Sequence, residues 1–96
     1  ERALIEKNAN TYLDKITYWR DCTQAKQIVS EACKAAKKTA EGKGLKNAEL
    51  IEQVSGYAKQ DRSETLAECV GDYVANGENA SILSKEVWKI LKRELG

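Results

Sequence analysis

The first candidates for catalytic or metal-binding groups are the acidic side chains between residues 47 and 86. Glu64, Glu68 and Asp72 follow one another at intervals of four, so a helix would place neighbouring members of the series on one face. Paired carboxylates can bind a divalent ion or act as general acid and base. The chain has no histidine, however, and so lacks the usual general base and the commonest metal ligand. We therefore interpret the series as a solvated acidic helix face.

Other catalytic signatures give no stronger signal. The glycines match neither a phosphate-binding loop nor a dinucleotide-binding fingerprint, and no calcium-binding loop spacing occurs. We predict that the protein is not an enzyme and has no catalytic residues, no metal site and no cofactor.

Three cysteines, Cys22, Cys33 and Cys69, leave two interpretations open. They can be three small buried side chains in a reducing compartment, which would place the protein in the cytoplasm of a cell. Alternatively, Cys69 forms a disulfide with Cys22 or Cys33 and one thiol stays free. A helix carrying both Cys22 and Cys33 would hold them about 16 Å apart, too far to bridge each other.

Charge is unevenly distributed along a chain whose formal net charge is only +1. Residues 34–46 contain five lysines and one glutamate, whereas residues 47–86 contain three basic and eight acidic groups. The two regions could attract each other, the lysines could contact phosphates, or the charge could serve solubility. The five lysines are called the basic patch below: Lys34, Lys37, Lys38, Lys43 and Lys46.

The elements that carry these groups are expected to be helices. The chain has no proline and is rich in Ala, Leu, Glu and Lys, which favour helix. We predict a single all-α domain, residues 1–96, folded as a compact bundle of four to five helices. No apolar run approaches the length of a membrane span, and we expect a soluble protein.

An apolar seam runs along the first twenty residues at heptad spacing and slips by one residue at Asp21–Gln24. The slip coincides with a capping-box sequence and predicts two helices, at about 2–20 and 22–41. The alternative is one helix of about 39 residues, roughly 58 Å long, which would project beyond a monomer unless a second chain covered it.

Small side chains mark the face of the second helix, and signals for helix ends divide the rest of the chain. Small and apolar residues, mostly Ala and Cys with Val29 among them, recur every three or four residues between Cys22 and Ala40, so other helices could approach this face closely. Asn47 is expected to cap a third helix, and Asp61 and Ser84 to cap the fourth and fifth. The fourth helix should end at Asn76–Gly77.

These features favour a non-enzymatic interaction module, with an adaptor or regulatory role, that binds a protein partner or itself. The first specific version of this hypothesis is a homodimer formed through the first helix. The alternative is a helical nucleic-acid-binding protein that uses the basic patch. The candidate interface residues are Ile5, Tyr12, Ile16, Trp19 and Trp88.

Overall fold

The computed structural model describes residues 2–19, 23–54 and 61–95, and these fold into five α-helices and one 3₁₀ turn. This confirms the predicted all-α bundle of four to five helices. The elements are α1 (Arg2–Trp19), α2 (Thr23–Lys37), α3 (Asn47–Val54), α4 (Arg62–Asn76), the 3₁₀ turn η2 (Gly77–Asn79) and α5 (Ile82–Leu95).

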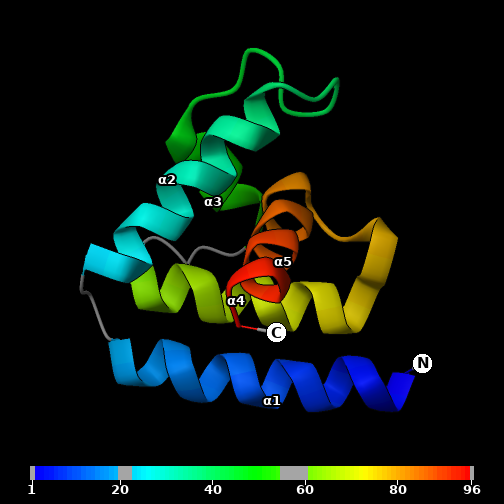
Figure 1. Ribbon diagram of the computed structural model, residues 1–96. Coiled ribbons are helices and arrows are strands. Elements are labelled where there is room, and N and C mark those ends of the chain that lie inside the picture. Colours follow the sequence, from blue (N-terminus) through cyan, green and yellow to red (C-terminus); the bar gives the residue numbers. More distant parts are fainter. Residues whose placement is uncertain (1, 20–22, 55–60, 96) are drawn as a thin grey trace.

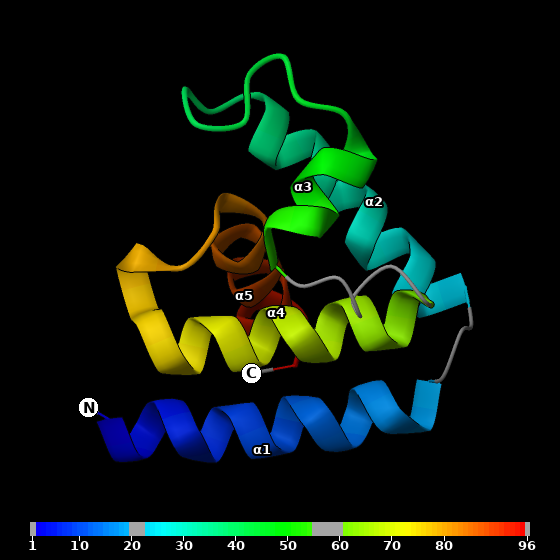
Figure 2. The same ribbon diagram turned by 180° about the vertical axis from the view of Figure 1, so that it is seen from behind.

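The helices are arranged around α4 and α5, which pack against each other. In both views α1 lies alongside α4 at one end of the molecule (Figures 1 and 2). Helix α2 packs on α5 and α4, and the loop that follows α2 forms the opposite end of the molecule. Helix α1 therefore depends on α4 for most of its contacts, whereas α4 and α5 are covered from several sides.

Helices α1 and α2 are separate and point in different directions (Figure 1). The longest dimension of the domain is 34 Å, well short of the roughly 58 Å that one continuous helix would need. The long first helix is therefore wrong, and the predicted break is correct. The capping-box residues Asp21 and Cys22 lie outside the described residues.

The small-residue face of α2 is buried against the other helices, as predicted. Its Ala and Cys side chains pack beside two larger residues, Ile28 and Val29, and face α4 and α5. Because alanine extends only one carbon from the backbone, the facing helices can lie close to α2. The buried residues of this face are Ala25, Ile28, Val29, Ala32, Cys33 and Ala36.

Helix α2 ends at Lys37, earlier than predicted, and its end is closed by Thr39 and Gly42. The Thr39 hydroxyl donates to the Ala36 carbonyl at 2.6 Å and accepts from the Gly42 N–H at 3.1 Å. A side chain at Gly42 would overlap the Ala36 carbonyl oxygen. Only glycine fits this return of the chain, and Ala40 lies beyond the helix and is exposed.

The ends of α4 follow the sequence signals. An Asp61 carboxylate oxygen accepts from the Glu64 N–H at 2.8 Å, as expected of a capping box. At the other end Gly77 has φ 56° and donates its N–H to the Tyr73 carbonyl. A positive φ is costly for residues with a side chain, so glycine defines this helix end.

Two predicted caps are displaced. Asn47 is the first residue of α3, and the Lys46 N–H before it donates to the Glu49 carboxylate at 2.8 Å. Helix α5 begins at Ile82, so Ser84 lies within its first turn, and Ser81 precedes the helix. In both helices the first residue is identified by the hydrogen bonds of the backbone groups at the helix start. Residue type alone does not reveal these partners.

Three aromatic rings join α1, α4 and α5. The Trp88 ring stacks on Tyr73, with centroids 4.5 Å apart, and meets Tyr12 edge-on at 5.1 Å. Such pairs add to the stabilisation that burial of the rings provides. Trp88 of α5 thus contacts both α1 and α4, and it is called the core anchor below.

The buried Tyr12 hydroxyl has no hydrogen-bond partner among the described residues, and burial raises the pKa of this phenol above its ordinary value. An unpaired buried hydroxyl costs about 1–3 kcal/mol of stability. We therefore expect Tyr12→Phe to leave the free energy of unfolding unchanged or to raise it by about 1 kcal/mol. Urea denaturation measures this difference.

Tyr73→Phe is the matched control, since its hydroxyl donates to the Glu78 carboxylate at 3.3 Å. This exposed bond should contribute at most about 1 kcal/mol, so the control should lose stability or show no change. A loss of more than 1 kcal/mol in Tyr12→Phe would contradict the assignment.

Candidate functional site

The apolar seam of α1 lies in the intramolecular core. Tyr12, Ile16 and Trp88 are buried, and Ile5 and Trp19 are partly buried against them. Helix α4 covers the face that was expected to receive a second chain. Tyr12, Ile16 and Trp88 are thus core positions, and Ile5 and Trp19 pack against the core, because the periodicity of the seam does not distinguish a neighbouring helix from a partner.

A second, sparser series on α1 faces outward and was missed. Leu4 and Tyr18 are the large apolar side chains found exposed among the described residues, at 57% and 85%. Thr11 lies midway between them and is also exposed. Residues seven apart occupy nearly the same side of a helix, so these three form one line, called the α1 stripe below. The spacing of seven was the available signal.

Two opposite charges border the α1 stripe. Lys7 and Asp14 are exposed, lie on the same flank of the stripe, and form no ion pair within the described part of the chain. Exposed Lys15 lies on the other flank. The surface thus combines two exposed apolar side chains with one charge of each sign on one flank, neither of them in an ion pair among the described residues.

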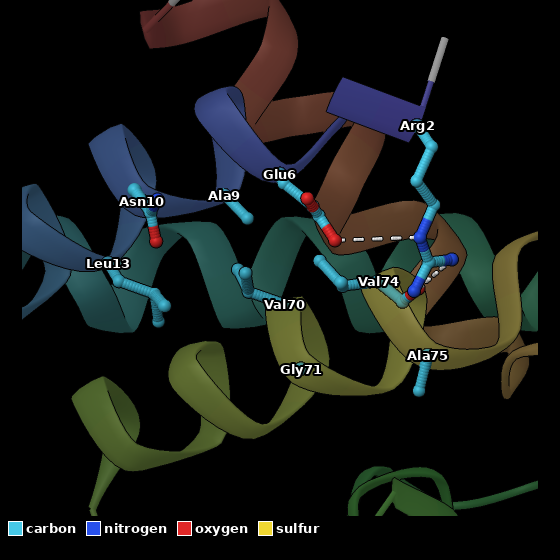
Figure 3. A pocket seen from close by; sticks show the side chains of 9 residues that line it. All are labelled: Arg2, Glu6, Ala9, Asn10, Leu13, Val70, Gly71, Val74 and Ala75. Atoms are coloured by element: carbon cyan, nitrogen blue, oxygen red, sulfur yellow. Dashed lines mark hydrogen bonds and ion pairs between the residues drawn. The ribbon is translucent and has the colours of Figure 1, made fainter. Parts of the chain in front are cut away.

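A groove of about 320 Å³ lies away from the α1 stripe, between α1 and α4 (Figure 3). The Arg2 side chain closes one end, pairing with Glu6 at 3.6 Å and donating to the Val74 carbonyl at 3.1 Å. Gly71 leaves the floor open, since a side chain there would meet nothing within 4 Å. The lining is mostly small and apolar: Ala9, Leu13, Val70, Val74 and Ala75, with Asn10 at the rim.

All five residues of the basic patch are exposed and lie together around the end of α2 and the following loop. None of their side chains forms an ion pair within the described residues. Attraction between this patch and the acidic region was one of three interpretations, and no ion pair joins the patch to that region among the described residues. The patch presents five positive charges to solvent.

The α5 helix adds basic groups beside α2. Lys85, in its first turn, pairs with Glu41 at 3.3 Å, and Arg93, near its other end, pairs with Glu31 at 2.8 Å. Since Glu41 follows Glu31 along the chain while Arg93 follows Lys85, the two segments run antiparallel. The hydrogen bonds that Arg93 donates to Glu31 and Glu94 raise the pKa of its guanidinium above the ordinary value.

Asp72 departs from the acidic face on which its spacing placed it. Whereas Glu64 and Glu68 are exposed, one Asp72 carboxylate oxygen accepts from the Ser81 N–H and hydroxyl at 3.0 Å and from Ser84 at 2.7 Å. Asn76 donates to the other oxygen at 2.7 Å. Asp72 thus holds the start of α5 on α4, where the helix dipole favours a negative charge.

The thiol beside this cluster is unsuited to nucleophilic chemistry. Cys69 is fully buried, and burial raises its pKa to about 12. Burial likewise raises the pKa of Cys33, and both residues are free thiols, so Cys69 is not bonded to Cys33. Because the thiolate is the reactive form, both thiols are structural core residues. Cys22 lies outside the described residues.

Comparison with known protein families, curated proteins and solved structures finds no match for this chain. Among the described residues, no group of three or more cysteines or carboxylates is placed to hold a metal ion. None of the described helices is both long and apolar enough to cross a bilayer.

Proposed function

We propose that this chain is a non-enzymatic interaction module that binds another protein chain through the outer face of α1, in the first instance a second copy of itself. The observation that carries the proposal is the exposure of Leu4 and Tyr18, at 57% and 85%, on one line of one helix. Tyrosine is a frequent anchor of protein interfaces because its ring buries a large area with little loss of side-chain freedom.

The flanking charges favour an antiparallel pair related by a twofold axis through Thr11. In that arrangement Leu4 of each copy faces Tyr18 of the other, and the stripe is self-complementary. Like flanks meet in antiparallel helix pairs, so Lys7 of one copy lies beside Asp14 of the other. Two ion pairs then form across the interface from groups that have no ion pair with any described residue of their own chain.

The interface would be small, and the pair is accordingly expected to be weak and reversible. Sedimentation equilibrium over a range of chain concentrations measures the association directly. Tyr18→Ala should raise the dissociation constant about tenfold or more, because it removes the largest apolar contact twice in the symmetric pair. A chain that stays monomeric up to millimolar concentration would contradict self-association.

A charge exchange tests the geometry separately from the apolar contacts. Lys7→Glu and Asp14→Lys should each raise the dissociation constant several-fold, since each opposes like charges across the twofold axis. The double variant Lys7→Glu/Asp14→Lys restores opposite charges and should recover the original association. Lack of recovery in the double variant would rule out the antiparallel arrangement.

A further inference from the structure

The basic patch lies where few carboxylates remain to neutralise it. Nearby Glu41 is paired with Lys85, and Glu31 with Arg93. The Glu49 carboxylate accepts the backbone N–H of Lys46. Each of these carboxylates thus has a partner other than a side chain of the basic patch, and the five ammonium groups form no ion pair within the described residues.

Two lysines of the patch occupy positions that the fold does not favour electrostatically. Lys34 and Lys37 lie in the last turn of α2, where the helix dipole favours positive charge. Lys43 and Lys46 instead precede α3, and positive charge beside the amino end of a helix is unfavourable. Stabilisation of helix ends can therefore account for the α2 lysines but not for Lys43 and Lys46.

The basic groups of helix α5 beside α2 are already paired with carboxylates. Lys85 and Arg93 lie beside α2, and Lys89, four residues from each, is on the same side of α5. Lys89 is exposed and pairs only with Glu86 of its own helix among the described residues, at 3.3 Å. The positive charges without an ion pair in the described residues here are therefore the five lysines of the basic patch, spread over the last turn of α2 and the loop after it. A group of this extent suits a polyanion better than a single phosphate.

The surroundings of the patch indicate which polyanion fits. The exposed large apolar residues Leu4 and Tyr18 lie on α1, at the other end of the molecule, and Leu45, the large apolar side chain of the loop, is partly buried against the core and not presented to a bilayer. No described aromatic ring lies on α2, α3 or the loop between them, whereas proteins that bind single strands usually stack bases on such rings. Lysines contact phosphates as point charges and do not read base edges in pairs as arginine does.

We propose that the basic patch binds the phosphate backbone of double-stranded nucleic acid without reading its sequence. Such binding depends on the release of counterions from the duplex, so its salt dependence reports how many phosphates the protein neutralises. Five lysines predict a slope of about −4.5 in a plot of log affinity against log salt. Affinity should then fall about 500-fold between 50 and 200 mM salt.

The test uses the whole chain and fluorescence anisotropy with two labelled duplexes of unrelated sequence. Both duplexes should bind equally and show the slope given above. Lys43→Ala/Lys46→Ala should reduce the slope by nearly 2, because each lysine accounts for about one phosphate. The same variant should keep or gain thermal stability, as these charges oppose the dipole of α3.

Lys15→Ala/Lys26→Ala is the matched control. It removes the same charge from exposed positions on α1 and on the end of α2 away from the loop, and it should leave the slope unchanged. An equal loss in the control would show that net charge alone is responsible and would overturn the proposal. Absence of duplex binding at 50 mM salt would overturn it too, as would preference for anionic vesicles, a polyglutamate peptide or a single strand over the duplex.

Discussion

Replacing Trp88 with alanine is expected to lower the free energy of unfolding by about 3–5 kcal/mol, the largest effect of any change considered for this chain. The indole ring is stacked on Tyr73 and touched edge-on by Tyr12, so its removal leaves a cavity where α1, α4 and α5 meet. A domain of this size has a total stability of about 5–14 kcal/mol. The variant should therefore be close to unfolding at 37 °C.

Urea denaturation followed by far-ultraviolet circular dichroism measures the loss. Trp88→Phe keeps an aromatic ring at the centre of the contact and should lose clearly less stability than the alanine variant. Tyr18→Ala is the surface control, and at concentrations where the chain is monomeric it should change stability by no more than about 0.5 kcal/mol. Equal effects at Trp88 and Tyr18 would contradict the assignment of Trp88 as a core anchor.

Replacing Asp72 with alanine is expected to cost about 3 kcal/mol, the second large effect. The change removes four hydrogen bonds to one carboxylate and leaves the fully buried Ser84 hydroxyl without its charged acceptor. Ser84 can still meet the Ser81 hydroxyl at 3.0 Å, which limits the loss. Glu68→Ala is the matched control, because Glu68 lies one turn earlier on α4 and is exposed.

The contribution of Asp72 should also depend on pH. Burial by itself would raise the pKa of this carboxyl, but hydrogen bonds from Ser84, Asn76 and Ser81 outweigh it and hold the pKa below its ordinary value. A carboxyl with a lowered pKa in the folded state stabilises the fold above its unfolded pKa of about 3.9. This stabilisation is lost as the pH falls through the lower, folded pKa.

The stability difference between the native chain and Asp72→Ala should accordingly be constant from about pH 5 to 7 and shrink below about pH 4. Thermal unfolding at a series of pH values measures it. A difference that does not change between pH 7 and pH 2 would show that the charge of Asp72 is not involved.

Local signals in the sequence predicted the helices well. The Asp61–Glu64 capping box and Gly77 set the ends of α4 as expected, because the partners of these residues lie within one helical turn. The small-residue face of α2 was recognised from its periodicity. Small side chains repeated along one side of a helix indicate that other helices pack closely against that side.

Features that depend on how helices meet could not be predicted in this way. The seam of α1 was correctly recognised as apolar, but whether Tyr12 and Ile16 face α4 or a second chain depends on how α1 is placed relative to helices far away in the sequence. Asp72 has the spacing of a surface acid, and its partners Ser81 and Ser84 reach it only because the chain reverses after Gly77. The α1 stripe was missed because the denser inner seam dominates the same helix.

The position of α1 at one end of the domain and of the loop after α2 at the other has a consequence for how the molecule could be used (Figures 1 and 2). A partner bound along α1 leaves the basic patch exposed, and a ligand bound at the basic patch leaves α1 exposed. A dimer formed through α1 would therefore carry its two basic patches on opposite outer ends. Such a dimer could bind two polyanions at once, because neither patch would block the other.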